Sequence, residues 1–271
     1  MSVLSKNTIE ELILPHLSWG KSGKMSDPAH VLCIVQLIFY RLKTGCQWRE
    51  LPIGHFMDQP YSWKSVFYHF NKWSKDGSWL CVWSALLKAH KHRLNLGTAQ
   101  LDGTHTPSKR GGQAVDYQPR KGCKTSNMLC IADEQGIIVA ASQPESGNHH
   151  DVFDIETHFE ELITMLKLIG IETKGLVLNA DSAFDTQTLR SLCAKHEIEP
   201  NFDLNPRNGS RWDRDDYFDP IAYKKRTIIE HAFAWLDAFK ALLVRYEITA
   251  RNWFAWNLIG FTAIFARKKI R

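Results

Sequence analysis

Three acidic residues in the sequence stand in settings that suit metal-dependent chemistry. Asp102 lies in the segment Leu101-Asp102-Gly103-Thr104, Asp181 follows a short aliphatic run, and Glu230 lies in a strongly periodic helical stretch. Carboxylates are the hard oxygen ligands that bind divalent cations, and two such cations together run phosphodiester cleavage or strand transfer. Because the three residues lie too far apart for a local metal loop, we expect the fold to bring them together.

Each acidic residue also has an ordinary structural interpretation. Asp102, next to a glycine, is suited to starting a turn, and Asp181 is suited to capping a helix. Glu230 is spaced to form a surface ion pair with Arg226, four residues earlier. In favour of a functional role, Tyr223, Arg226 and Glu230 share a helical face separate from the apolar face, which is formed by Ile229, Phe233, Leu236 and Leu243.

The elements that must position these carboxylates follow from hydrophobic patterning after residue 96. The order strand, strand, strand, helix, strand, helix, strand, helix predicts a mixed α/β sheet whose first strand is central beside the fourth. Asp151 and Asp185 are best read as helix caps, with metal-shell roles as the alternative. The predicted elements are strands at 99–104, 125–132, 137–142, 175–178 and 198–204, and helices at 151–168, 186–195, from 221, and from 252.

The first 95 residues predict a different, all-helical region, and 95–97 looks like a boundary. Helices are expected at 28–44, 63–74 and 78–93, after a basic loop at 19–25. Such short helices with a basic face resemble a helix-turn-helix module, although a small packing bundle is the alternative. In the 63–74 helix, the expected inward residues are Val66, Phe67, Phe70 and Trp73, and those left for solvent or phosphate are Lys64, His69, Lys72 and Lys75.

Charge is distributed unevenly along the chain. Residues 1–95 carry a formal charge of +6, residues 96–220 carry −8, and residues 221–271 carry +7. Basic ends suggest a polyanion partner, whereas the acidic middle suits cations. A glycine-containing segment at 107–124 is suited to lie on a phosphate backbone, with Lys109, Arg110, Arg120, Lys121 and Lys124 as the candidate contacts.

Other classes of protein are disfavoured. The six cysteines form no Cys-x-x-Cys pair, so we expect neither a zinc site nor a disulfide framework. We expect reduced thiols in a cytoplasmic protein instead. We take His105, His149 and His150 for exposed loop residues rather than zinc ligands. The sequence lacks a run of about 18 apolar residues and a signal-peptide layout, so we expect no membrane partner.

Three segments together resemble a known family. Leu101–Thr104, Asn179–Asp185 and Tyr223–Glu230 followed by Phe233–Leu236 look like the catalytic segments of bacterial insertion-sequence transposases of the DDE type. The similarity is to the IS-five branch of the IS-four superfamily, and it spans essentially the whole chain. The segment Leu42–Pro52 is similar to the helical region before the catalytic domain in that family.

The resemblance implies a fold, a reaction and partners. It implies a helix-turn-helix-like DNA-binding domain at 1–95 and a ribonuclease-H-like catalytic domain at 96–271 with a small insertion near 198–220. It also implies cut-and-paste transposition with two Mg²⁺ ions, which Mn²⁺ can replace, held by Asp102, Asp181 and Glu230. Expected partners are transposon-end DNA, target DNA and further copies of the chain, in a bacterial cytoplasm and on the nucleoid when DNA is bound.

The resemblance further assigns Tyr223 and Arg226 to transposon-end phosphates. The broader family signature has a lysine seven residues after the glutamate, but this chain has Asp237 there, with Lys240 as the nearest substitute. The alternatives to a transposase are a metal-dependent nuclease without strand transfer and a catalytically silent sequence-specific DNA-binding protein. The intact set of three acids argues against the silent protein.

Overall fold

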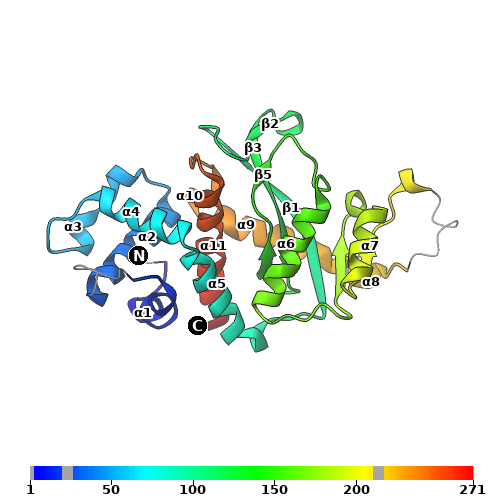
Figure 1. Cartoon of the computed structure of the whole chain (residues 1–271), viewed down its shortest axis with the longest axis horizontal. Coiled ribbons are helices and arrows are strands. Elements are labelled where there is room, and N and C mark those ends of the chain that lie inside the picture. Colours follow the sequence, from blue (N-terminus) through cyan, green and yellow to red (C-terminus); the bar gives the residue numbers. More distant parts are fainter. Residues whose placement is uncertain (1–2, 20–26, 210–216, 271) are drawn as a thin grey trace. The chain divides into compact units, whose positions relative to one another are not determined.

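The computed structural model of the chain describes residues 3–19, 27–209 and 217–270 (Figure 1). Contacts divide the chain into two compact units: unit 1 contains Met1–Ala89 and Trp235–Arg271, and unit 2 contains His90–Ala234. The C-terminal segment therefore packs with the N-terminal helices rather than with the sheet. The predicted loop at 19–25 lies, apart from Trp19, outside the described residues.

Helix α2, Pro28–Thr44, has the bounds that its end signals predict. The Asp27 side chain accepts a hydrogen bond from the backbone N–H of Ala29 at 2.9 Å, and Pro28 occupies the first turn, where a missing N–H costs nothing. Gly45 ends the helix at φ 64°, a conformation that favours glycine. The backbone of Lys240 also passes 3.1 Å from where a Cβ of residue 45 would lie, so this position excludes a side chain.

Helix α4, Trp63–Lys75, corrects one predicted face. His69 is buried and Phe67 is exposed, the reverse of the expectation. The buried residues Val66, His69, Phe70 and Trp73 follow the i, i+3, i+4, i+7 spacing of one helical stripe, and Phe67 falls beside it. Burial lowers the pKa of His69 to about 4, so the ring packs as a neutral group near Trp73.

The other elements of unit 1 are also helical. The predicted 78–93 helix stops at Ala89, where unit 1 gives way to unit 2, and a separate 3₁₀ turn follows at Lys91–Arg93. The remaining helices of unit 1 are α1 Lys6–Leu12, α3 Ile53–Phe56, α5 Ser78–Ala89, α10 Lys240–Leu243 and α11 Ala250–Phe265, with 3₁₀ turns at Leu14–His16 and Trp48–Glu50 and a π-helical end at Ala266–Ile270.

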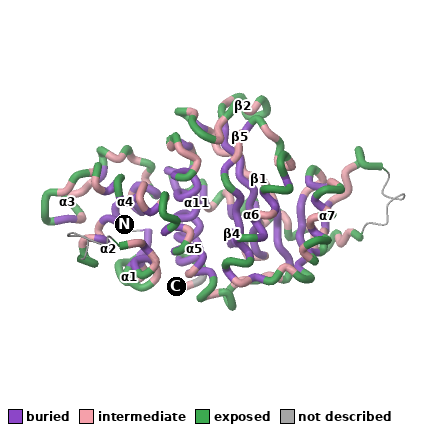
Figure 2. The backbone as a smooth tube through the Cα atoms, in the orientation of Figure 1, coloured by how far each residue is buried: buried purple, intermediate pink, exposed green. Residues whose placement is uncertain are grey.

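Helix α11 forms the centre of unit 1. Every residue from Asn252 to Phe265 is buried, and Figure 2 shows the helix in purple along its length. It packs against α5, α4, α2 and α10. The Trp256 ring stacks on Phe70 with centroids 4.5 Å apart. A mainly apolar helix that is buried on all sides needs neighbours on all sides, and the N-terminal helices and α10 supply them.

A buried ion pair ties α2 to the segment before α11. Arg41 Nη2 lies 3.1 Å from Glu247 Oε1, and both side chains are 8% exposed. The same glutamate oxygen accepts a hydrogen bond from Trp256 Nε1 at 2.9 Å. The guanidinium carbon of Arg41 lies 4.5 Å and 4.8 Å from the ring centroids of Trp48 and Trp256, respectively. Two far-separated parts of the sequence are thus joined inside one core.

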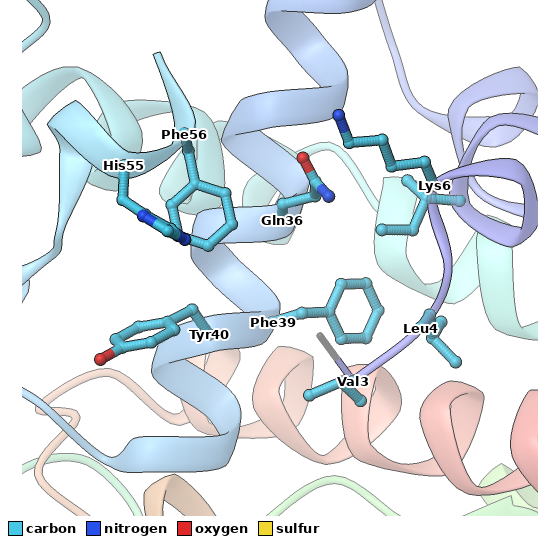
Figure 3. A pocket seen from close by; sticks show the side chains of 9 residues that line it. Val3, Leu4, Lys6, Gln36, Phe39, Tyr40, His55 and Phe56 are labelled. Carbon is cyan, nitrogen blue, oxygen red and sulfur yellow. The ribbon is translucent and has the colours of Figure 1, made fainter. Parts of the chain in front are cut away.

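A cavity of about 340 Å³ opens in unit 1, between the N-terminal segment, α2 and α3 (Figure 3). Its walls are mainly aliphatic and aromatic, with Lys6, Gln36 and His55 as the polar members. Among the described residues that line it there is no carboxylate and none of the predicted site residues. The other lining residues are Val3, Leu4, Ile9, Phe39, Tyr40 and Phe56.

Unit 2 is built on a mixed sheet with the order β2-β3-β1-β6-β7, and β4 and β5 also pair with β3. β1 is central, antiparallel to β3 and parallel to β6, which confirms the predicted neighbours. The predicted hairpin is present as β3 and β4. The strands are β1 Thr98–Pro107, β2 Asp116–Gln118, β3 Cys123–Ala132, β4 Ile138–Ala141, β5 Glu145–Ser146, β6 Val177–Ala180 and β7 Glu199–Phe202.

Helices pack on the strands of this sheet. α6, Ile155–Leu168, packs on β3 and β4, and α7, Gln187–Lys195, packs on β7 and α6. The expected long closing helix is instead divided into α8 Pro220–Tyr223, a 3₁₀ helix at Lys224–Thr227 and α9 Ile228–Asp237, which runs from unit 2 into unit 1. Leu243, expected on its apolar face, is 48% exposed in α10. No helix in the described ranges has the length and apolar character needed to cross a membrane.

Candidate active site

Asp102 lies in the middle of β1, opposite Cys130 of β3. The strand runs on to Pro107, beyond the predicted end at 104, so Asp102 does not start a turn. Its side chain is 19% exposed, and its Oδ1 accepts a hydrogen bond from the backbone N–H of Gly103 at 2.8 Å. A carboxylate is thus held on the central strand with limited access to water.

Asp181 follows β6 directly, at the carboxyl end of the strand beside β1. Its Oδ1 accepts a hydrogen bond from the backbone N–H of Ala183 at 2.8 Å, so it does cap the 3₁₀ turn Ser182–Phe184. Gln100 and Asn179 are partners in the parallel pairing of β1 and β6, and Asp102 and Asp181 each follow two residues later. The two acids therefore belong to neighbouring positions of neighbouring strands.

Glu230 lies in the first turn of α9, and its side chain is 60% exposed. Arg226 joins it to the sheet: Arg226 Nη1 is 3.4 Å from Asp102 Oδ2, and Arg226 Nη2 is 3.6 Å from Glu230 Oε1. The expected helical ion pair is present, but the same guanidinium also reaches the carboxylate on β1. One cation thus lies between two of the three predicted ligands.

The electrostatics of Asp102 show that negative charge is concentrated here. Burial raises the pKa of Asp102 to about 6. The Gly103 N–H and the Arg226 guanidinium act in the opposite direction, whereas the charges of Asp181 and Asp151 add to the increase. A half-buried carboxylate beside other carboxylates is stabilised by a cation, which Arg226 provides.

Tyr223 lies beside Arg226, as their shared face predicts. The Arg226 guanidinium carbon is 5.9 Å from the Tyr223 ring centroid. Burial raises the pKa of Tyr223, and the charges of Asp203 and Asp181 act in the same direction. The Tyr223 phenol and Asp181 are therefore parts of one electrostatic environment.

Asp151 is not a helix cap, which corrects the first of the two cap predictions. Asp154 is the residue before α6, and Asp151 turns instead toward the sheet, where its Oδ1 accepts a hydrogen bond from Asn127 Nδ2 at 2.8 Å. His105 Nε2 lies 3.5 Å from the same oxygen, so His105 belongs to strand β1 and not to an exposed loop. A side chain at Gly103 would collide with this carboxylate, which explains the glycine inside a central strand.

Asp185 is not a cap either. The Thr186 side chain caps α7 by accepting from the backbone N–H of Leu189. Asp185 is fully buried, forms an ion pair with Arg190 at 2.8 Å, and accepts a hydrogen bond from the backbone N–H of Asn205. It fastens the chain after β7 to the start of α7 and stays away from solvent.

The predicted basic DNA contacts lie in both units. In unit 2 all five in the 107–124 segment are exposed: two lie in the irregular connection between β1 and β2, as the predicted loop implies, and three lie in the β2–β3 hairpin. In unit 1 Lys64 and Lys240 are exposed, whereas Lys72 is half-buried with its Nζ 3.4 Å from the backbone oxygen of Ser18. Lys109 and Arg110 are the two residues of the connection, and Arg120, Lys121 and Lys124 are the three of the hairpin.

The three acids do not yet form a complete ligand cluster. Within residues 3–19, 27–209 and 217–270, no three Asp, Glu, His or Cys side chains are grouped closely enough to hold a metal ion. Asp102 and Glu230 instead share the Arg226 guanidinium as their ion-pair partner. The donor chemistry nevertheless fits a divalent cation, because the side chains are carboxylates and a positive group is already held there.

Two models of known protein families match the chain. A family model described as a transposase DDE domain matches residues 93–265, more than half of the chain. The chain belongs to the DDE transposases. A second model, for transposases of the IS4/5 family, matches residues 7–83 of this transposase. The catalytic domain of this family is ribonuclease-H-like and generally uses a divalent metal. No curated protein and no solved structure matches the chain.

The structure of the transposase adds residues that the sequence reasoning missed. Gln100, Asn179 and Asn201 are buried amides on β1, β6 and β7. Asp203 continues β7, with its backbone N–H 3.4 Å from the Ala180 oxygen. The signal that marks them is an amide followed two residues later by an aspartate, repeated as Gln100/Asp102, Asn179/Asp181 and Asn201/Asp203.

Proposed function

We propose that this transposase mobilises an insertion sequence. It binds the terminal inverted repeats, cleaves at the transposon ends, and joins the resulting 3′-OH ends to target DNA. The observation that carries the proposal is the arrangement of two carboxylates on neighbouring central strands and a third on α9, with Arg226 contacting two of them.

The reaction consists of two phosphoryl transfers. A water oxygen attacks the phosphorus at the transposon end, and the bond to the 3′ oxygen breaks to leave a 3′-OH. That hydroxyl then attacks a target phosphodiester, forms a new bond to phosphorus, and releases a 3′-OH of the target strand. When bound, two Mg²⁺ ions, or Mn²⁺ in their place, would activate the attacking oxygen and stabilise the leaving oxygen.

The chain's own residues have separate parts in this proposal. Asp102, Asp181 and Glu230 hold the metal ions, and the low exposure of Asp102 limits competition by water. Arg226 and Tyr223 face the transposon-end phosphates. In unit 2 the exposed basic residues of the 107–124 segment contact the DNA backbone, namely Lys109, Arg110, Arg120, Lys121 and Lys124.

Unit 1 has a DNA-binding part in the same proposal. Residues 1–95 recognise the repeats, with Lys64 and Lys72 as phosphate contacts, and residues 96–271 carry the catalytic function. Lys240 replaces the missing signature lysine at Asp237. Copies of the chain assemble on the DNA so that two ends are processed together, in the bacterial cytoplasm and on the nucleoid.

One assay tests the proposal against its alternatives. The purified protein is incubated with Mg²⁺, a supercoiled target plasmid and DNA fragments that carry the inverted repeats flanking its coding sequence. Joined fragment and plasmid are the expected product. Cut ends without joining would instead assign a nuclease, and a retarded band with uncut DNA would assign a binding protein.

Matched variants make the assay specific to the site. Asp102→Asn, Asp181→Asn and Glu230→Gln should each abolish cutting while DNA binding persists. Glu199→Gln, at an exposed position of β7, should retain wild-type cutting. Cutting by any of the three site variants at the wild-type rate would remove that residue from the mechanism.

A further inference from the structure

Three buried amide side chains form a continuous ladder across β1, β6 and β7. Asn179 Nδ2 donates to Gln100 Oε1 at 2.8 Å, and Asn201 Nδ2 donates to Asn179 Oδ1 at 2.7 Å. The strand register places Gln100 opposite Asn179 and Asn179 opposite Asn201. All three side chains are at most 2% exposed, so the ladder lies inside the protein.

The ladder also binds the backbone of the segment that begins α8. Asn179 Nδ2 is 3.1 Å from the Ala222 oxygen, and Asn201 Nδ2 is 3.0 Å from the Asp219 oxygen. The Asp219 N–H donates to Asn201 Oδ1 at 2.7 Å. Partly buried backbone groups are stabilised by hydrogen-bond partners, and here side chains of the sheet are among those partners.

This attachment matters because α8 is only four residues long. So short a helix has no stability of its own, and its position depends on tertiary contacts. Tyr223 is its last residue, and Arg226 and Glu230 follow in the 3₁₀ helix and in α9. The position at which Ala222 is fixed therefore determines the backbone positions of Tyr223, Arg226 and Glu230.

The same strands carry the acids. Gln100 and Asn179 precede Asp102 and Asp181 by two residues each, and side chains two apart on a strand point to the same face. Each of these two amides thus lies two residues before a carboxylate, which is one repeat of a β-strand. If α8 moved relative to the ladder, Arg226 and Glu230 would move relative to Asp102 and Asp181.

We propose that Gln100, Asn179 and Asn201 are positioning residues, which set the placement of Tyr223, Arg226 and Glu230 against Asp102 and Asp181. The inference rests on the proposed function for its catalytic consequence, but the placement of α8 is a property of the protein alone. Apolar side chains would fill the same space, yet the Asp219 N–H would lose its Asn201 acceptor, and the Asp219 and Ala222 oxygens would each lose one donor.

The first test replaces Asn179 with leucine, which has a similar shape and no donor. Backbone hydrogen exchange over 219–227 should accelerate at least tenfold, while β1 and β6 amides keep their protection. Cleavage kcat should fall about 100-fold, because a misplacement of about 1 Å costs that much, with KM for end DNA within threefold. Asn257→Leu, a buried amide of α11 that donates to the Trp253 oxygen at 2.9 Å, is the matched control.

The second test moves one methylene group from the side chain at position 100 on β1 to the side chain at position 179 on β6. Gln100→Asn shortens the ladder, Asn179→Gln lengthens it, and the double variant restores the total length. Each single variant should lower kcat at least tenfold, and the double variant should recover a large part of the loss. A role in stability alone predicts lower Tm values without recovery of kcat in the double variant.

The outcomes separate the two proposals. Wild-type kcat in Asn179→Leu, or a loss equal to that of Asn257→Leu, would overturn the positioning role. If Asn179→Leu does not fold, Gln100→Asn and the double variant decide the question. If the wild-type protein cuts no DNA, the proposed function fails, and unchanged exchange at 219–227 in the variants would then be the result that refutes the ladder.

Discussion

At the scale of single residues, Arg226 is the side chain that links the carboxylates of the site. It contacts Asp102 at 3.4 Å and Glu230 at 3.6 Å, and its charge opposes the rise in the pKa of Asp102. A guanidinium and a divalent cation cannot both occupy the space between these carboxylates. DNA phosphates that attract Arg226 would leave the carboxylates available, so metal and DNA binding should support each other.

Replacing Arg226 with glutamine should therefore tighten metal binding in the absence of DNA. We expect about a tenfold lower Kd for Mn²⁺, measured by titration calorimetry, because a competing positive charge is removed. DNA should increase the Mn²⁺ affinity of the wild-type protein and have little effect on the variant. Lys225→Gln is the control, since Lys225 carries the same charge but pairs with Glu134 at 2.7 Å. Equal effects of both variants would mean that only net charge matters.

The raised pKa of Asp102 predicts a pH dependence. Because its folded pKa is about 6, above the ordinary value of 3.8, the carboxyl takes up a proton as the pH falls through 6. Mn²⁺ affinity should then decrease below pH 6, since protons and metal compete for the same oxygen atoms. The stability effect has the opposite sign: in the metal-free protein this group favours the folded state below pH 4 and loses that contribution as the pH rises through 6.

The Asp102→Asn variant tests both predicted pH dependences, that of Mn²⁺ affinity and that of stability. The variant should bind Mn²⁺ weakly at every pH, and the difference in Tm between variant and wild type should change between pH 4 and 6. A wild-type Mn²⁺ affinity that stays constant between pH 7 and 5 would contradict the assignment of Asp102 as a ligand.

At the scale of elements, the β2–β3 hairpin carries an exposed aromatic among basic residues. Tyr117 is 51% exposed and stands opposite Lys124 in the strand register. The hairpin is held to the sheet edge by Gln118, whose Nε2 donates to the Gly147 oxygen at 2.6 Å. An exposed aromatic face next to cations suits an unpaired base and its phosphate.

Tyr117→Ala should weaken binding of DNA with a single-stranded tail by about tenfold, the typical loss when one base-stacking partner is removed. Binding of blunt duplex should change less than twofold. Fluorescence anisotropy of labelled oligonucleotides gives both values. Tyr246→Ala removes a tyrosine of the same exposed fraction, 51%, and should leave both affinities unchanged. Equal losses for tailed and blunt DNA would argue against stacking.

At the scale of the whole molecule, the two termini of the chain share one core. Helix α11 supplies the buried centre of unit 1 and packs on α2, α4 and α5, so the N-terminal helices lose a shared packing partner without it. A fragment of residues 1–95 should therefore lack cooperative thermal unfolding in circular dichroism. The full chain should show it. A fragment that unfolds cooperatively would demonstrate that these helices form an independent domain.

The buried pair of Arg41 and Glu247 joins the two ends of that core. Glu247→Ala should lower the free energy of unfolding by about 3–5 kcal/mol, because it leaves a buried guanidinium without its counter-charge. Chemical denaturation measures the change. Lys174→Ala breaks an exposed pair with Glu197 and should cost at most about 1 kcal/mol. Similar losses in both variants would show that burial adds nothing to the pair.

Local patterns in the sequence predicted most elements of the fold. They also marked the three segments that carry the family resemblance. The end signals of α2, the β3–β4 hairpin and the central position of β1 beside β6 were all predicted, because caps, turns and hydrophobic periods are local properties. The motif segments likewise identified the family.

Only the tertiary structure decided which distant groups meet. A helix such as α11, which is buried around its whole circumference, has no exposed polar face to show which unit covers it. Asp151, next to His150, resembles a cap in sequence, but its partners Asn127 and His105 lie on other elements. The sequence repeats an amide two residues before an aspartate, but it does not show that these amides bond to one another and to α8. Hydrogen bonds between strands depend on register, and register is a property of the assembled sheet.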